Sequence, residues 1–213
     1  MKKTNPDSSV SCETFIETLN RELSFPGIEL QNETATKLYL FWEHLCSWNS
    51  THNLTSVTTY EDAVQKHFVD SLLPVLIPSL FNKVEKVLDF GTGAGFPGVP
   101  LSLYFPHINF TLLDKARKKT SFLQFLSASL DIPNIYPINA EISQYFEKFD
   151  IIISRAVNLN EKTLHDLAKN LLPGGTVVSY LSEFQSPVSG IFEYSGFEFD
   201  LPFTKRKIFC YRF

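Results

Sequence analysis

The spacing of apolar residues along the chain changes near residue 83. Before this point apolar residues recur every three or four positions, which predicts helices over 12–23, 32–48 and 60–76. Beyond it, short apolar runs alternate with helical segments. The predicted strands cover 84–90, 110–114, 135–139, 149–154 and 176–181, with two further strand-like runs in the tail. The predicted helices of this part cover 97–105, 116–130 and 160–171, the last ended by Pro173-Gly174-Gly175.

Strands that alternate with helices are typical of a mostly parallel sheet covered on both faces, so we expect an α/β fold. The helices of residues 1–82 should form an N-terminal extension that packs on a core of residues 83–213, as one structural unit. The polar first ten residues are expected to be disordered.

Composition narrows the class of protein. The net charge of −4 argues against a general nucleic-acid coat protein but allows a local basic patch. The cysteines, Cys12, Cys46 and Cys210, are widely spaced, and no cluster has metal-ligand spacing, so we expect neither disulfide nor metal. No signal-peptide core or membrane-spanning run is present, and no long apolar stripe is left over. We expect a cytoplasmic monomer that does not contact membranes.

A glycine-rich loop, Gly93-x-Gly95-x-x-Gly98, follows the first predicted strand. This spacing alone is a weak signal, shared by several cofactor classes. Asp89 precedes the loop, and a carboxylate 4 Å from a phosphate charge costs about 4 kcal/mol at an effective dielectric near 20. Pro97 removes an N–H group that would otherwise bind phosphate. Both residues favour the cationic S-adenosylmethionine over a dinucleotide; alternatively, Asp89 caps a turn or helix.

A second acid ends the next strand, "FTLLD". Asp114 lies about twenty residues beyond the loop, where a carboxylate accepts hydrogen bonds from ribose hydroxyls. This feature serves NAD and S-adenosylmethionine equally. Ala140 and Glu141 follow the third strand, where an adenine ring could lie, although the same residues could start an ordinary helix.

Five segments carry a family resemblance: "HNLTSV" (52–57), "HFVDSLL" (67–73), "DFGTGAGFPGVPLSL" (89–103), "FTLLDKARKKTSFL" (110–123) and "ISRAV" (153–157). In this order and spacing they resemble the bacterial 16S rRNA guanine-N7 methyltransferase family, also called glucose-inhibited division protein B, from about Trp42 to Gly175. The resemblance implies a class I S-adenosylmethionine-dependent methyltransferase, with a Rossmann-like, seven-stranded, mostly parallel sheet and an N-terminal helical extension. It also implies a substrate, N7 of guanine 527 in 16S rRNA, met as free rRNA, an assembly intermediate or the small ribosomal subunit.

The resemblance also implies site residues. Those that would line the cofactor are Asp89, Gly91, Thr92, Gly93, Gly95, Phe96, Asp114, Ala140, Glu141 and Arg155. Those that match family positions near the reacting face, and would be catalytic, are His67, Asp70, Ser71 and Arg155.

The chain departs from the family pattern after the fifth strand, where Leu181 occupies the position of a usual lysine. Another cation would have to substitute, with Lys205, Arg206 and Lys207 as candidates. The basic run that follows Asp114 could contact phosphate, although such a run is usually just a solvated helix face. The expected RNA-binding residues are Lys115, Arg117, Lys118, Lys119, Lys205 and Arg206.

Guanine N7 carries a free lone pair, so its methylation needs alignment of the reactants rather than a general base. Asp70 could stabilise the developing positive charge. His67 is otherwise a packing residue, and Arg155 otherwise forms an ion pair with an acid at the end of the sheet, such as Asp150. Three rival functions remain: a methyltransferase for small molecules or proteins, an NAD-dependent oxidoreductase, and a non-catalytic nucleotide-binding regulator.

Overall fold

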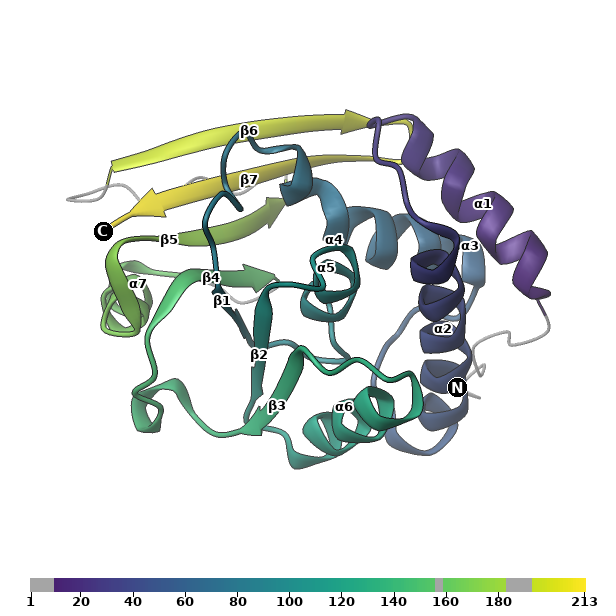
Figure 1. Cartoon of the computed structure of the whole chain (residues 1–213), viewed down its shortest axis with the longest axis horizontal. Coiled ribbons are helices and arrows are strands. Elements are labelled where there is room, and N and C mark those ends of the chain that lie inside the picture. Colours follow the sequence, from purple (N-terminus) through teal and green to yellow (C-terminus); the bar gives the residue numbers. More distant parts are fainter. Residues whose placement is uncertain (1–9, 156–158, 183–192) are drawn as a thin grey trace.

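A computed structural model describes residues 10–155, 159–182 and 193–213 of the chain. Apart from Val10, the N-terminal stretch predicted to be disordered lies outside these residues, as do Ala156 and Val157 of the "ISRAV" segment. A sheet runs through the described part, with α1 and α2 at the right of Figure 1 and α7 at the left.

The predicted helices and strands all have counterparts in the structure. The helices are α1 Cys12–Ser24, α2 Asn32–His52, α3 Tyr60–Ala63, α4 Asp70–Leu72, α5 Gly98–Tyr104, α6 Arg117–Ser129 and α7 Glu161–Ala168. The other helical turns are η1 Val64–Val69, η2 Leu73–Leu76 and η3 Ile142–Gln144. The strands are β1 Lys86–Phe90, β2 Asn109–Asp114, β3 Ile135–Asn139, β4 Phe149–Arg155, β5 Leu171–Ser182, β6 Glu193–Leu201 and β7 Thr204–Arg212.

The seven strands form one sheet in the order β3-β2-β1-β4-β5-β7-β6, which confirms the predicted α/β class. The first five strands pair in parallel, and β7 lies antiparallel between β5 and β6. Strand β1 pairs with both β2 and β4, so the chain leaves it first to one side and later to the other. In open α/β sheets, ligands bind outside the carboxyl ends of the strands at such a switch point.

Alternate residues of the strands build two separate cores, because successive side chains point to opposite faces. Val87 of β1 belongs to the larger core, which also contains the apolar residues of α1, α2, α5 and α6. Leu88 belongs to the smaller core under α7. Within the larger core the indole of Trp42 is fully buried. The N-terminal helices therefore share their hydrophobic core with one face of the sheet.

The first helix shows how local sequence fixes these elements. Ser11 accepts a hydrogen bond from Thr14 N at 3.1 Å and caps α1. Phe15, Leu19 and Leu23, spaced by four, bury one face of the helix. None of the described helices is long and apolar enough to cross a membrane.

The predicted third helix exists, but its middle is wound differently. Residues 60–76 form one continuous helical segment in which Val64–Val69 is a π-helix. The apolar pattern gave no sign of this, because a π turn differs from an α turn by a single residue. Such turns are rare and are frequently found at functional sites. His67 lies within this one.

The predicted end of the helix over 160–171 was wrong. Helix α7 ends at Ala168, and Pro173-Gly174-Gly175 lie within β5. The chain turns into the sheet at Asn170, whose side chain donates to Tyr145 O at 2.6 Å and Glu147 O at 3.1 Å. Its carbonyl accepts from Phe149 N at 2.9 Å. These bonds end the helix before the proline is reached.

Candidate functional site

The glycine-rich loop joins β1 to α5, and its glycines serve different purposes. Gly93, at φ +62°, lines the cleft, and an added Cβ there would meet no close neighbour, since it would lie 3.9 Å from Gly91 O and 4.0 Å from Lys119 Nζ. Gly95, at φ +103°, faces the core, where an added Cβ would lie 2.8 Å from both Leu123 and Val99. Only the first leaves room for a ligand against the backbone.

Asp89 organises this loop from beneath. Its Oδ2 accepts from Thr92 Oγ1 at 2.7 Å and from Gly98 N at 2.8 Å. The carboxylate is buried, and burial raises its pKa to about 6. Its Oδ1 has no hydrogen-bond partner among the described residues. Since Asp89 occupies the first amide of α5, that helix end is not free to bind a phosphate.

Asp114, at the end of β2, lines the cleft and has its carboxylate held from three sides. Its Oδ2 accepts from Gly93 N at 3.0 Å and from Lys119 Nζ at 3.1 Å, and its Oδ1 accepts from Ala116 N at 2.8 Å. The two backbone bonds fix the carboxylate in place. The lysine, on a flexible side chain, is the partner that a ribose hydroxyl would replace most easily.

A cleft of about 580 Å³ opens at the carboxyl ends of the strands, which is within the usual size range for small-molecule sites. Its walls come from the glycine loop, the turns after β2 and β3, the end of β4, and the segments around Leu54 and His67. The cleft therefore lies where the topology predicts a ligand.

Arg155 and Arg206 share one buried carboxylate beside the cleft. Asp70 is 1% exposed, and its Oδ2 lies 3.1 Å from Arg155 Nη1 while its Oδ1 lies 2.6 Å from Arg206 Nε. Arg155 reaches the cleft wall, with its guanidinium carbon 5.5 Å from the centre of the Phe96 ring. Arg155 does form an ion pair, but with Asp70 and not with Asp150, whose carboxylate accepts from backbone amides at the start of β1.

His67 is held through both ring nitrogens. Nδ1 lies 3.4 Å from Arg155 Nη2, and because arginine can only donate, Nδ1 accepts and the proton lies on Nε2. Nε2 then donates to Thr55 Oγ1 at 3.0 Å. The ring also stacks on Phe96, with centroids 4.6 Å apart. Burial, assisted by the Arg155 charge, lowers the pKa of His67 to about 3, so the imidazole is neutral.

A sequence model of the family described as rRNA small subunit methyltransferase G matches residues 34–186, more than half of the chain. The chain belongs to this family. This confirms the resemblance that was inferred from the motifs. All five motif segments lie within the matched residues.

Relatives named ribosomal RNA small subunit methyltransferase G support the family. The protein of Caldanaerobacter subterraneus subsp. tengcongensis is 42% identical over 148 residues, which cover 67% of this chain and 62% of the relative. That of Lachnoclostridium phytofermentans is 36% identical, covering 79% and 70%. That of Macrococcus caseolyticus is 37% identical, covering 64% and 59%. The chain thus spans less than two thirds of several of the relatives it matches.

Solved structures with the same fold include a SAM-dependent methyltransferase from Aquifex aeolicus, with a TM-score of 0.50, 15% identity, and coverage of 65% of this chain and 88% of that one. TrmN from Thermus thermophilus gives a TM-score of 0.52 at 16% identity, covering 70% and 53%. The chain therefore has the class I, Rossmann-like fold of S-adenosylmethionine-dependent methyltransferases, as predicted.

The structure brings most of the predicted site residues of this family member together. Those that line the cleft are His67, Gly91, Thr92, Gly93, Phe96, Asp114, Lys115, Lys119, Ala140, Glu141 and Arg155. Asp89 and Gly95 lie behind the loop, while Asp70 acts on the cleft through Arg155. Ser71 is fully buried and donates to His67 O within its own helix.

The remaining predicted RNA-binding residues are spread over two places. Arg117 and Lys118 are exposed on α6 near the cleft. Lys205 lies on β7, 3.6 Å from Asp200 of β6, and Arg206 is held by Asp70. Cross-strand pairing places Leu181 opposite Lys207, and the Leu181 carbonyl accepts from Arg206 Nη1 at 3.4 Å. A guanidinium therefore lies beside the position where the family usually has lysine.

The list of predicted site residues missed part of the cleft wall. Leu54 and Thr55 line the cleft, but no role was predicted for them from the sequence. Both belong to the family segment "HNLTSV", which could have indicated that they lie at the site. Ile142 and Ser143 line it as well, and they follow Glu141 directly. Among the described residues, no group of three or more His, Cys, Asp or Glu side chains could hold a metal ion.

Proposed function

We propose that the protein transfers a methyl group from S-adenosylmethionine to N7 of guanine 527 in 16S rRNA. Membership of the rRNA small subunit methyltransferase G family supports the type of reaction and the class of substrate. The chemistry of the cleft supports the choice of atom. The place of action would be the cytoplasm, on free rRNA, on an assembly intermediate or on the small subunit, with a monomer as the working unit.

The cleft residues fit S-adenosylmethionine better than a dinucleotide. The first amide of α5 is bound to Asp89, so the usual phosphate site at a helix N-terminus is closed. Asp114 would hold the ribose, Ala140 and Glu141 would flank the adenine, and Gly93 would let the ligand approach the backbone. When bound, the cofactor supplies a methyl group that its sulfonium already activates.

The observation that favours N7 is the state of His67. Both of its ring nitrogens are engaged, and its pKa near 3 leaves it neutral and a poor proton acceptor at physiological pH. An oxygen or an exocyclic amine normally needs a proton removed when it is methylated, whereas N7 of neutral guanine attacks with a free lone pair. A cleft whose histidine serves as a fixed wall suits the second kind of acceptor.

The residues around His67 would hold the acceptor in line with the methyl group. Arg155 presents donors at the cleft wall, where a guanidinium can fork to a base oxygen or a phosphate. Asp70 has both carboxylate oxygens bound to arginines, so it would act by positioning Arg155 and not by touching the substrate.

The test is methylation by the purified protein. The protein is incubated with methyl-labelled S-adenosylmethionine and either 16S rRNA or small subunits, and nuclease digests are analysed by mass spectrometry. We expect one N7-methylguanine, at position 527. Asp114→Asn should weaken cofactor binding at least tenfold, while Asp166→Asn, which removes an exposed acid paired with Lys169, should not. Methylation of another atom, or of small molecules alone, would overturn the proposal.

A further inference from the structure

Two helices beside the cleft carry a row of aromatic residues that extends from the core to the surface. His44, Trp48 and His52 recur every four residues along α2, and Phe122 and Phe125 lie on the facing side of α6. Trp48 joins them: its ring centroid is 5.5 Å from those of Phe122 and Phe125, and 5.2 Å from that of His52. We call these five residues the α2–α6 strip.

The outer part of the strip is accessible to solvent. Phe125 is 39% exposed although it packs against both Trp48 and His44, the latter at 5.1 Å between ring centroids. His52 is exposed, and Trp48 is half-buried. Phe122 is fully buried and anchors the row to the core. Phe125 is thus an aromatic ring that is held by aromatic neighbours and remains partly accessible, as a stacking platform for a base must be.

The two helix segments that carry the strip contain basic residues but no acidic ones, although the whole chain carries −4. Residues 44–52 and 117–129 contain no Asp or Glu, whereas Arg117, Lys118 and Lys119 lie in the first turn of α6. Arg117 and Lys118, like Lys115 before them, form no ion pair with another residue in the described ranges. This charge matches a polyanion, and an apolar protein partner would not require it.

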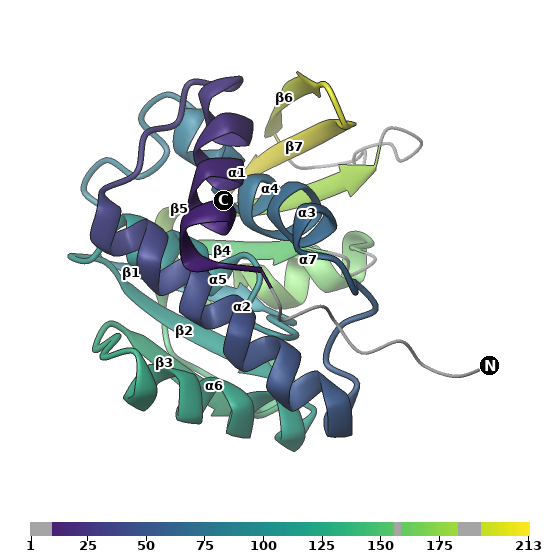
Figure 2. The same ribbon diagram turned by 90° about the vertical axis from the view of Figure 1, so that its right-hand side faces the viewer.

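The strip begins at the mouth of the cleft. Lys115 and Lys119 line the cleft at one end of α6, and Leu54 and Thr55 line it just after α2. Lys118 Nζ donates to His52 O at 2.8 Å and links the two helices there. Phe125 lies six residues beyond Lys119, about 9 Å along the helix axis. Figure 2 shows α2 and α6 side by side, and residues of the two helices are in contact.

We infer that the α2–α6 strip binds the single-stranded nucleotides next to the methylated base. A base would stack on Phe125, with Trp48 and His44 supporting that ring, while Arg117 and Lys118 bind neighbouring phosphates. Proteins hold single-stranded RNA with aromatic rings and cations that lie next to one another, because every base offers a flat face and every linkage a charge. The inference rests on the proposed function and names the surface that would recognise its RNA.

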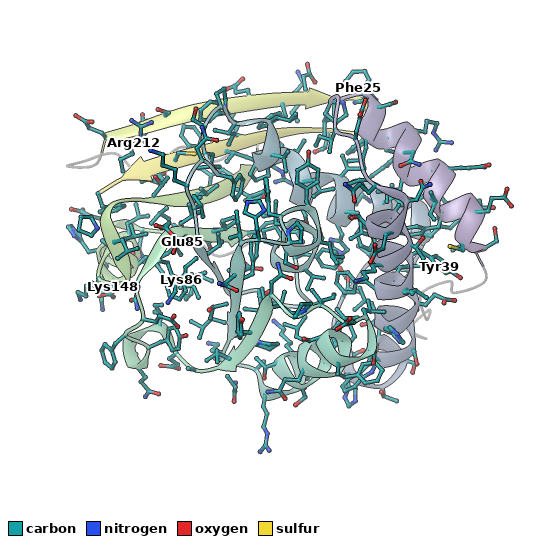
Figure 3. All side chains as sticks on the ribbon, in the orientation of Figure 1. Phe25, Tyr39, Glu85, Lys86, Lys148 and Arg212 are labelled. Carbon is teal, nitrogen blue, oxygen red and sulfur yellow. The ribbon has the colours of Figure 1, made fainter. Side chains whose placement is uncertain are left out.

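Binding of an RNA fragment tests it. The probe is a 16S rRNA hairpin with guanine 527 in its loop, and the affinity is measured at several salt concentrations. Phe125→Leu keeps an apolar side chain but removes the ring, and should weaken binding about five- to a hundredfold. Phe125→Tyr keeps the ring and should bind like wild type. Phe25→Leu is the matched control, since Phe25 is 61% exposed at the end of α1, far from α6 (Figure 3).

The role of the basic residues is tested separately, by the salt dependence of RNA affinity. Lys118→Gln should lower the slope of log affinity against log salt by about one. Lys148→Gln is the matched control, because Lys148 Nζ also donates to a backbone carbonyl, Lys169 O. It should leave the slope unchanged, since Lys148 lies at the opposite side of the molecule (Figure 3). S-adenosylmethionine binding should be unchanged in every variant, which shows that each remains folded.

The outcomes separate the two proposals. If wild type neither binds nor methylates the RNA, the proposed function fails. If wild type does both and Phe125→Leu binds as tightly as wild type, the strip is packing alone and the inference fails. Equal losses in Phe125→Leu and Phe125→Tyr would also overturn it, since the ring would then not be the cause.

Discussion

Replacing Gly95 with alanine tests whether this glycine of the loop serves the core or the cofactor. An added Cβ would lie 2.8 Å from Leu123 Cδ2, 2.8 Å from Val99 Cγ2 and 3.4 Å from Phe41 Cζ. All three side chains are fully buried, so none can move without disturbing its neighbours. The substitution should therefore act on stability first, and on the cleft only through the displaced loop.

The size of the effect follows from two costs. A positive φ costs an L-residue other than glycine about 1–2 kcal/mol, and inserting a methyl group into a filled core costs about 1–3 kcal/mol. Gly27→Ala isolates the first cost, because Gly27 has a φ of +81° and nothing within 4 Å of an added Cβ. We expect Gly95→Ala to lower the free energy of unfolding by about 1–3 kcal/mol more than Gly27→Ala does.

Urea denaturation of both variants measures this difference. In a domain of this size 1 kcal/mol shifts the melting temperature by about 2–4 °C, so thermal scans provide a second measurement. Equal losses of stability in the two variants would refute the packing argument and would mean that Leu123 and Val99 yield easily. Gly93→Ala, with no atom closer than 3.9 Å to its Cβ, should disturb the core no more than Gly27→Ala.

Three further predictions concern ionisable groups. Burial raises the pKa of Asp89 from 3.8 to about 6. The stability that this group contributes is therefore fully present below pH 4, and the free energy of unfolding falls by about 3 kcal/mol as the pH rises through 6. When Asp89→Asn is denatured between pH 4 and 7, its free energy of unfolding should not show this fall. If it falls with pH in parallel with that of wild type, the prediction is contradicted. Asp70→Asn should cost about 3 kcal/mol of unfolding free energy, because Arg155 and Arg206 lose their shared buried carboxylate; a loss below about 1 kcal/mol would contradict it. The His67 ring should show no titration by NMR between pH 5 and 8, and a midpoint near 6.5 would refute the buried, neutral imidazole.

The sequence was sufficient for the features that depend on local patterns. Asp114 and Arg155 were placed at strand ends by counting apolar runs, and both strands end at these residues. The glycine spacing located the loop, and the family segments located the cleft. These features are predictable because strand ends, turns and caps depend on neighbouring residues.

What the sequence could not supply depends on contacts between distant residues. Arg206 lies 136 residues from Asp70, and no spacing rule joins a residue of the last strand to one of an early helix. The turn at Asn170 depends on the same kind of contact, since its side chain donates to Tyr145 O. The packing role of Gly95 could not be predicted either, because it depends on Leu123 and Val99 lying against this glycine in the folded chain.

The position of β7 between β5 and β6 constrains the order in which the sheet can assemble. Strand β6 precedes β7 in the chain, but among the described strands it pairs with β7 alone, so it can join the sheet together with β7 or after β7 has docked on β5, and not earlier. Until β7 docks, β5, with Val177, Val178 and Tyr180 among its apolar residues, is an open edge that another chain can extend. The carboxylates of β6, by contrast, make a poor edge for further pairing once both strands are in place. During folding, the sheet is thus most open to aggregation just before its last two strands are added.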